Sequence, residues 1–409
     1  MGQRPPALEP VATPVTSPTA ETAVRPEPAQ EPVTPSPAAP AGSPAPAPEA
    51  DPLDAILAGL STADKVGQLF LAGFEGPDAA GAAAAIAELR VGGIALVANA
   101  TTADEARPLT AGLQQLARAA GLSPLLIAVD HEGGPVQRIR VGVTDLGSNW
   151  QLGRVQPIER AVLAACSRGA IHGRELADLG IQMNLAPVLD VLDNPQNTVI
   201  GERSYSSDPQ TVARLGTAYI QGLQAQGVLA VGKHFPGHGS TTEDSHLTLP
   251  VVRHDRNWLD AHELVPFQAA IQANVAAIMT AHVSYPAIDP VPSRPGSLSP
   301  VIVSGLLRGD LGYDGLVITD DMGVMEAITG RYEPGDAAVK AVQAGSDMLI
   351  VVGPIERQRR MAQAIVSEVG TSISPERLDA SVRRVLRAKQ QAGLLGTKRS
   401  SPAPAGPAC

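Results

Sequence analysis

Short apolar runs alternate with longer helix-like segments along most of this chain. Eight runs are rich in Val, Ile and Leu, and they occupy residues 68–74, 93–98, 124–130, 180–191, 227–235, 276–283, 315–320 and 347–353. Strands that are apolar on both faces and that alternate with helices are typical of a parallel sheet covered on both sides. The alternation therefore predicts an α/β fold built around parallel strands.

The segments between the runs have helical composition, and they set the number of repeating units. They occupy residues 79–90, 103–120, 159–179, 211–226, 260–273, 335–344 and 355–369, and a last helix is predicted at 375–392. Eight strands alternating with helices match a single (β/α)8 TIM barrel. An open doubly wound sheet favours a glycine-rich turn after an early strand, with an acidic residue about 20 positions later. Residues 130–134, DHEGG, lack that spacing, so the barrel is preferred.

The two ends of the chain differ in composition from the middle. Fifteen of the first 52 residues are Pro, mixed with Ala, Glu, Thr and Ser. Such a tract cannot bury enough apolar surface to offset its ordering entropy. Residues 396–409 contain a second stretch of Pro and Ala. We therefore expect a disordered Pro/Ala-rich tail at 1–52, one domain at 53–395 and a second disordered tail at 396–409.

Charge and hydropathy argue against two kinds of binding partner, nucleic acids and the membrane interior. The net charge is −10, the pI is about 5.3 and Lys and Arg form no cluster, so nucleic-acid binding is not expected. No apolar run reaches about 18 residues, so we expect no membrane span. The N-terminal tail lacks the apolar core of a secretory signal. We expect a monomer that is cytoplasmic as the chain stands, or a cell-envelope or secreted protein if an upstream signal has been removed.

Polar and charged residues gather where the predicted strands end. They stand at or just after the ends of five runs: Asp130, Asp190, Lys233, His234, His282 and Asp320. In a barrel these ends meet at one face, where active sites are built. Each residue taken alone could be a helix cap or a surface charge. Their recurrence, strand after strand, predicts a functional site at that face.

The fifth run opens into a loop, KHFPGHGSTTEDSH at residues 233–246, that is dense in proton-carrying groups. It contains three histidines, one lysine and two carboxylates, while Pro236, Gly237 and Gly239 interrupt regular structure. Such a loop at the end of a buried strand is typical of an active site. His234 and His238 have the HxxxH spacing of a zinc site, but that spacing places both ligands on one face only in a helix. We therefore expect no metal here.

Carboxylates with Arg and Lys around an open pocket suit a polyhydroxylated ligand such as a sugar. A strand-end carboxylate can attack an anomeric carbon, and a second group must then protonate the leaving oxygen. The residues alone leave open three candidates for that second group: Glu243, the pair Asp244 and His246, and Glu132. An Asp two positions from a His can fix the tautomer of the imidazole and raise its basicity.

The loop at 233–246 resembles the signature loop of the glycoside hydrolase family 3 β-N-acetylglucosaminidases. Residues 130–138, DHEGGPVQR, are similar to the family segment DQEGGRVQR. Further similar segments are APVLDV at 186–191, GERSY at 201–205 and GLVITDDM at 315–322. The segments follow the order of the family, and the resemblance extends over residues 54–392.

The resemblance implies a single (β/α)8 catalytic domain that removes terminal β-linked N-acetylglucosamine, often from peptidoglycan fragments, through a covalent glycosyl-enzyme. By position, Asp320 matches the family nucleophile, and His246 matches its acid/base with Asp244 as partner. The matched sugar-binding positions are Asp130, Arg138, Arg203, Lys233 and His234. The resemblance implies no metal or organic cofactor, and the expected partner is a small sugar or muropeptide.

Two departures from the family lie beside Asp130, because His131 replaces Gln and Pro135 replaces Arg. We expect them to alter the contour of the sugar pocket. Residues 236–242 are predicted to act as a hinge that brings His246 to bound sugar. Two other activities stay open. One is phosphorolysis, because a histidine acid/base lets phosphate compete with water, and the other is catalytically silent binding of cell-wall sugars.

Overall fold

In the computed structural model, which describes residues 51–396, eight parallel strands close into a barrel. In chain order they are β1 (Phe70–Ala72), β2 (Gly93–Leu96), β3 (Leu126–Val129), β6 (Met183–Asn184), β7 (Leu229–Phe235), β8 (Ala277–Thr280), β9 (Leu316–Asp321) and β10 (Met348–Val351). Neighbours pair in the order β1-β10-β9-β8-β7-β6-β3-β2, and β2 then pairs with β1 to close the ring. The predicted (β/α)8 architecture is confirmed.

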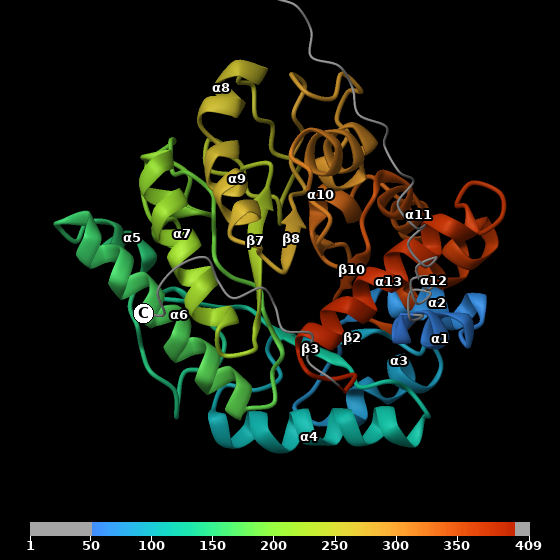
Figure 1. Cartoon of the computed structure of the whole chain (residues 1–409). Helices are drawn as coiled ribbons and strands as arrows, with labels where there is room; N and C mark the ends of the chain where they lie inside the picture. The colour runs from blue at the N-terminus through green and yellow to red at the C-terminus, as the bar shows by residue number, and fades with distance from the viewer. Residues whose placement is uncertain (1–50, 397–409) are drawn as a thin grey trace, which may run out of the picture. The chain divides into compact units, whose positions relative to one another are not determined.

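Helices surround the strands on the outside (Figure 1). Those that follow the successive strands are α3 (Ala83–Ala87), α4 (Ala103–Ala119), α6 (Ile158–Asp178), α7 (Pro209–Gln224), α9 (Leu264–Gln272), η4 (Val301–Asp310), α11 (Pro334–Ala344) and α12 (Ile355–Glu368). A helix occurs in every segment where the composition predicts one, and the predicted last helix is α13 (Pro375–Gln391). Within this ring α6 and α7 lie side by side and pack against each other.

Shorter elements lie between the main strands and helices. They are α1 (Pro52–Ala58), α2 (Thr62–Gln68), α5 (Asn149–Gly153), α8 (Arg256–Ala261), α10 (Glu326–Thr329), the 3-10 turns η1 (Ala79–Ala82), η2 (Gly201–Arg203) and η3 (Gly296–Leu298), and a hairpin of β4 (His131–Gly133) and β5 (Val136–Gln137). The hairpin directly follows β3, so it stands at the end of the barrel where the predicted site residues gather.

Two elements differ from the sequence-based expectation. The π-helix η4 lies between β8 and β9, where no helix is predicted, because its Val, Ser and Gly residues have low helix propensity. Burial of Ile302 and Leu306 in the core stabilises it instead. The predicted strand 180–191 shortens to β6, since Pro187 has no N–H for a ladder, and one isolated bridge between Val188 and Lys233 remains.

Aliphatic side chains from alternating strand positions fill the barrel interior. The buried cluster contains Leu71, Ala95, Leu126, Ala128, Met183, Leu229, Val231, Ala277, Met279, Leu316, Ile318, Met348 and Ile350. Val385 and Ala388 of α13 belong to the same cluster. Lys389 of α13 bonds Gln68 and Ser123, which precede β1 and β3. Helix α13 therefore closes the N-terminal end of the barrel, and the opposite end is left to polar residues.

The tails predicted at 1–52 and 396–409 lie outside the described residues except at their inner edges. Asp51 accepts a hydrogen bond from the Leu53 N–H and caps α1, so regular structure begins at Pro52. Between residues 51 and 396, no helix combines the length and the apolar character needed to cross a bilayer.

Candidate active site

A cavity of about 270 Å³ opens at the C-terminal ends of the strands. Seven of the residues singled out from the sequence line it: Asp130, Arg138, Arg203, Lys233, His234, His246 and Asp320. The eighth, Asp244, is not part of the lining and bonds His246 instead. Barrel closure thus brings together residues that are up to 190 positions apart in the chain, Asp130 and Asp320.

A buried ion cluster forms one wall of the cavity. Lys233 Nζ lies 2.6 Å from Asp130 Oδ1 and 2.6 Å from Glu132 Oε1. Arg203 binds Glu132 in a fork, with Nε 2.9 Å from Oε2 and Nη2 2.8 Å from Oε1. Burial would raise the pKa of Glu132, but the charges of Arg203 and Lys233 hold it well below the usual range. Since both oxygens are occupied by cations, Glu132 is poorly suited to donate a proton.

Asp130 and Arg138 have hydrogen-bonding atoms toward the opening that are available to a ligand. Arg138 Nη2 is 3.7 Å from Asp130 Oδ2, too long for a direct hydrogen bond. The Arg138 side chain is 41% exposed, while that of Lys233 is only 2% exposed. A hydroxylated ligand can therefore bond Asp130 and Arg138 without first breaking a tight ion pair.

Asp190, which follows β6, holds the histidine at the end of β7. Its Oδ2 is 2.7 Å from His234 Nδ1, and its Oδ1 accepts hydrogen bonds from the backbone N–H of His234 at 3.2 Å and of His238 at 2.7 Å. Burial opposes the charge, yet the interaction with His234 leaves the pKa of Asp190 below its usual value. The bond to Nδ1 turns His234 Nε2 toward the cavity, where it is 3.5 Å from Arg203 Nη2.

Asp320 lies near the end of β9 and faces the ion cluster. Its Oδ1 accepts a hydrogen bond from the Asp321 N–H at 2.8 Å. Burial raises the pKa of Asp320, but His234, His282 and this N–H together hold it below the usual range. His282 in turn is fixed by Ser297 Oγ at 2.7 Å and by the Asp321 carbonyl at 3.1 Å. An ionised, partly unbonded carboxylate is suited to attack an electrophilic carbon.

His246 and Asp244 form a pair at the cavity mouth. His246 Nδ1 is 2.8 Å from Asp244 Oδ1, which also accepts the backbone N–H of His246 at 2.8 Å. The His246 side chain is 59% exposed. The backbone beside it is bound to the start of α10, because Glu326 N–H donates to the His246 carbonyl and Ala327 N–H to the Ser245 carbonyl. The pair therefore stands open to solvent on a docked segment.

The predicted hinge at 236–242 is instead packed through Thr241, with Ser240 half-buried and the others buried. Residues 235–239 are buried, and Asn197 Nδ2 donates to the carbonyls of His238 and Gly239. A Cβ at Gly239 would overlap the Val191 carbonyl oxygen, so this glycine is needed for close approach rather than for flexibility. The exposed part of the loop begins at Thr242 and runs to Thr248, broken by the buried Ser245.

The expected effect of His131 and Pro135 on the pocket contour is not supported, because neither side chain lines the cavity. His131 is 1% exposed, and its ring packs edge-on against His172 with centroids 4.7 Å apart. Asn184 bonds both the N–H and the carbonyl of His131. Pro135 is exposed at the tip of the β4–β5 hairpin. The hairpin backbone turns both away from the site.

The HxxxH pair is used for hydrogen bonds within the loop and its neighbours. His238 Nδ1 is 2.8 Å from Thr241 Oγ1, and its Nε2 is 3.3 Å from Ser245 Oγ. His234 Nδ1 is taken by Asp190. Across residues 51–396, no group of three or more His, Cys, Asp and Glu side chains has the arrangement of a metal site.

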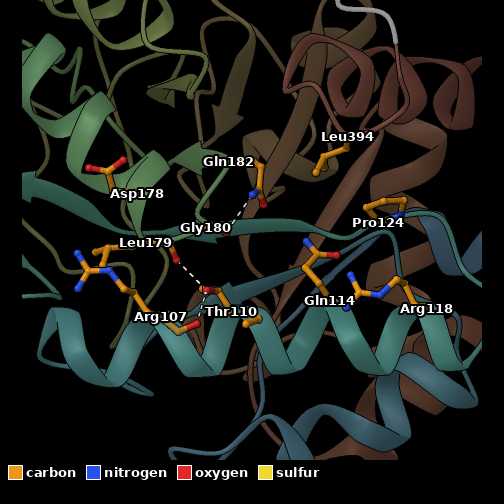
Figure 2. A pocket seen from close by; sticks show the side chains of 11 residues that line it. Arg107, Thr110, Gln114, Arg118, Pro124, Asp178, Leu179, Gly180, Gln182 and Leu394 are labelled. Atoms are coloured by element: carbon orange, nitrogen blue, oxygen red, sulfur yellow. Dashed lines mark hydrogen bonds between the residues drawn. The ribbon is translucent and has the colours of Figure 1, made fainter.

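A larger hollow, about 480 Å³, lies near the N-terminal ends of β3 and β6 beside α4 (Figure 2). Three of its polar side chains, those of Thr110, Gln114 and Gln182, are bonded to backbone groups around them. Thr110 donates to the Leu179 carbonyl at 2.7 Å, and Gln182 donates to the Gly180 carbonyl at 2.9 Å. Asp178 is the one carboxylate in its lining. The chemistry is therefore assigned to the smaller cavity.

Several supporting residues of the site are not among those that the family resemblance assigns to catalysis or sugar binding. Glu132, Asp190, His238, His282 and Asp321 hold the catalytic and binding candidates in place. Four of the five lie in the recognisable motifs, and all five lie near or just after the ends of predicted strands. Their supporting roles depend on hydrogen-bond partners that the linear pattern does not reveal.

Known proteins resemble this chain over most of its described length. The model for the glycosyl hydrolase family 3 N-terminal domain matches residues 61–388. Beta-hexosaminidase A of Pseudoalteromonas piscicida is 38% identical over 326 residues, which cover 74% of this chain and 54% of that protein. Beta-hexosaminidase LpqI of Mycobacterium tuberculosis is 35% identical over 336 residues, covering 78% and 82%.

A solved structure shows the same fold. The glycoside hydrolase family 3 β-N-acetylglucosaminidase from Paenibacillus sp. superposes with a TM-score of 0.79 at 45% identity, covering 84% of this chain and 65% of that one. The chain thus spans little more than half of the Pseudoalteromonas protein and under two thirds of the Paenibacillus protein. The family match, the barrel and the strand-end motifs together show that the chain belongs to glycosyl hydrolase family 3.

Proposed function

We propose that the chain is a retaining exo-β-N-acetylglucosaminidase that removes terminal β-linked N-acetylglucosamine, with peptidoglycan-derived fragments as its substrate class. The observation that carries the proposal is that Asp320 and His246 line one cavity while Asp244 holds His246 Nδ1. A carboxylate nucleophile and a proton donor facing one sugar are what retaining hydrolysis requires. The names of the relatives, β-hexosaminidase and β-N-acetylglucosaminidase, support the identity of the sugar.

In the first step, Asp320 attacks the anomeric carbon. The bond from the carboxylate oxygen to that carbon forms as the glycosidic bond breaks, and His246 Nε2 gives its proton to the leaving oxygen. The lowered pKa of Asp320 supports this role because the carboxylate is ionised at neutral pH. Asp244 accepts from His246 Nδ1, which leaves Nε2 for the transfer and stabilises the charged imidazole.

In the second step, water replaces the protein at the anomeric carbon. His246, now neutral, takes a proton from water at Nε2 as the water oxygen attacks, and the ester bond to Asp320 breaks. This returns His246 to its protonated form and Asp320 to its carboxylate. The sugar leaves with the configuration it had in the substrate.

Binding of the sugar falls to the ion cluster and its neighbours. We assign its hydroxyl contacts to Asp130, Arg138, Arg203, Lys233 and His234. Because His246 is largely exposed, we propose that residues 242–248 carry it toward the bound sugar, hinged after the buried Thr241. The catalytic domain is assigned to residues 53–395.

Trapping with a 2-fluoro sugar tests the nucleophile. An activated 2-fluoro glycoside should accumulate as an ester, and peptide mapping should find the label on Asp320. Asp320→Asn should neither carry the label nor hydrolyse an aryl β-N-acetylglucosaminide. A label on any other residue would exclude Asp320 as nucleophile.

Product analysis with and without phosphate tests the reaction class. We expect free N-acetylglucosamine at the same rate in both cases. A sugar 1-phosphate as the main product would establish phosphorolysis instead, and tight binding without turnover would establish a sugar-binding protein.

A further inference from the structure

A buried acid lies beneath the active-site loop and takes no part in the chemistry proposed above. Glu263 directly precedes α9, and its side chain is fully buried. Among residues 51–396, neither of its carboxyl oxygens makes a hydrogen bond of good geometry, although the N–H groups of Val191 and Ser240 lie near enough to lower its pKa. The buried Ser240 hydroxyl also lies beside this carboxyl, and within that range it has no other hydrogen-bond partner. Buried unpaired polar groups are uncommon in native proteins and call for an explanation.

Glu263 packs directly against the loop backbone at Gly237. A Cβ at residue 237 would overlap Glu263 Oε2, so glycine is required to make room for the acid. Gly237 has a φ of +133°, a conformation that L side chains rarely adopt. The Tyr285 hydroxyl donates to the Gly237 carbonyl at 2.7 Å. Gly237 thus lies against the Glu263 side chain, and the Tyr285 hydroxyl binds its carbonyl.

The next residue connects this support to the catalytic cavity. The His238 N–H donates to Asp190 Oδ1 at 2.7 Å, and Asp190 Oδ2 bonds His234 Nδ1 at 2.7 Å. A displacement of Gly237 would move the His238 N–H and loosen Asp190. His234, whose ring faces the cavity, would then lose the partner that orients it.

The surroundings of Glu263 disfavour a charged carboxylate. Burial and the negative charge of Asp190 raise its pKa well above the usual range, and they outweigh the Ser240 hydroxyl and the N–H groups of Val191 and Ser240, which lower it. Tyr285, which also faces the carboxyl, has a raised pKa because of its own burial and stays neutral. An unpaired charge in this setting would be costly, whereas a neutral acid can donate its proton to a hydroxyl oxygen.

We propose that Glu263 is a positioning residue that acts as a neutral acid: its O–H donates to Ser240 Oγ, and its carboxyl supports Gly237 and through it the Asp190–His234 pair. Glu263 touches neither the sugar nor the reacting atoms, so its effect is indirect. The kinetic side of this inference rests on the proposed function, whereas the protonation state of Glu263 does not.

Three variants test the proposal. In Glu263→Gln the amide is neutral, has the same shape and can still donate to Ser240, so kcat/KM on an aryl β-N-acetylglucosaminide should stay close to that of the parent. Glu263→Ala removes the support, and a misplacement of about 1 Å should lower kcat/KM by about 100-fold. Asp347→Asn is the control, because Asp347 is a buried carboxyl at the start of β10, bonded to the Val317 N–H and to Ser381. It should lower stability and leave kcat/KM unchanged.

Infrared spectroscopy measures the protonation state of Glu263 independently of any enzymatic activity. The parent protein at pH 7 should show the carbonyl band of a buried protonated carboxylic acid, and that band should be absent from Glu263→Gln. If the parent does not hydrolyse glycosides, the proposed function fails, and the presence or absence of this band still decides whether Glu263 is a neutral acid.

Two results would overturn the inference. One is a kcat/KM for Glu263→Gln as low as that of Glu263→Ala, because it would show that a neutral side chain of the same shape cannot replace Glu263. The other is a folded Glu263→Ala protein with the kcat/KM of the parent. If Glu263→Ala does not fold, the test depends on the kcat/KM of Glu263→Gln and on the infrared spectra. If the parent and Glu263→Gln then show the same carbonyl band, the proposal is overturned.

Discussion

Two consecutive carboxyl groups, Asp320 and Asp321, meet different environments at the end of β9. Asp321 accepts backbone N–H groups from Gly323, Val324 and Val352, so its oxygens are used to hold the following turn and β10. Burial and the charge of Asp320 raise the pKa of Asp321 to about 6. Asp320 has a single backbone donor and a lowered pKa. Of the two, Asp320 is better suited to the proposed role of nucleophile.

Replacing His246 with Gly tests the acid/base role. For leaving groups that need a proton, kcat/KM should fall by about 100-fold or more, because proton donation in the first step is lost. An activated aryl leaving group should lose little in kcat/KM. A series of aryl glycosides of graded leaving-group pKa measures the difference. His254→Gly is the control, since His254 stacks on Trp258 and does not line the cavity. An equal loss of kcat/KM for all leaving groups in His246→Gly would contradict the acid role.

At the scale of elements, the loop after β7 consists of two parts that differ in burial and in hydrogen bonding. Its first part is buried and bonded to Asp190 and Asn197. Its second part is mostly exposed, carries Asp244 and His246, and rests on the start of α10 through two backbone hydrogen bonds. Any movement of the proposed acid/base pair therefore has to break contacts with α10, while the end of β7, to which we assign sugar binding, stays in place.

Gly239→Ala should damage the first part of the loop. The added methyl would overlap the Val191 carbonyl, and since backbone atoms must shift, we expect a loss of about 1–3 kcal/mol in unfolding free energy together with a fall in kcat/KM. Gly59→Ala is the matched control, because its Cβ would meet neighbours at 3.5 Å or more and its φ is −80°. Chemical denaturation and kinetics measure both effects. A Gly239→Ala protein as stable as Gly59→Ala would contradict the close packing.

At the scale of the whole molecule, the two ends of the barrel use buried cations differently. Lys233 at the catalytic end is paired with two carboxylates, and these hold its pKa above the usual value although burial opposes them. Lys389 at the closed end donates to neutral oxygens, Gln68 Oε1 at 2.8 Å and Ser123 Oγ at 3.0 Å, and no carboxylate within residues 51–396 pairs with it. Burial lowers the pKa of Lys389 to about 7.

The stability of the folded chain should accordingly rise with pH above neutrality. Between about pH 7 and 10.5, the unfolded state holds a proton on Lys389 that the folded state has released, so unfolding free energy increases by up to about 1.4 kcal/mol per pH unit. Below about pH 7 both states are protonated and the dependence ends. Lys389→Met should reduce the slope by this amount. Chemical denaturation at pH 8 and 9.5 measures it, and equal slopes in both proteins would contradict a neutral Lys389.

Most of the barrel was predictable because strands buried on both faces leave continuous apolar runs in the chain. The exceptions have local causes: η4 contains poor helix formers that are stabilised by burial, and Pro187 prevents β6 from extending. The strand-end positions of Asp130, Lys233 and Asp320 were also predictable, since the chemistry of a barrel gathers where its strands end. The orientation of His131 was not, because a hairpin decides it.

The sequence by itself determined the barrel and the residues at its catalytic end. Only the tertiary structure decided their pairing: Lys233 with Asp130 and Glu132, His234 with Asp190, and Glu263 with Gly237. The physical reason is the distance along the chain between the partners. Periodicity and strand ends are local properties, whereas Lys233 and Asp130 are 103 positions apart, and His234 and Asp190 are 44 apart. Such partners are selected by strand register, barrel closure and the exclusion of water, which no short segment specifies.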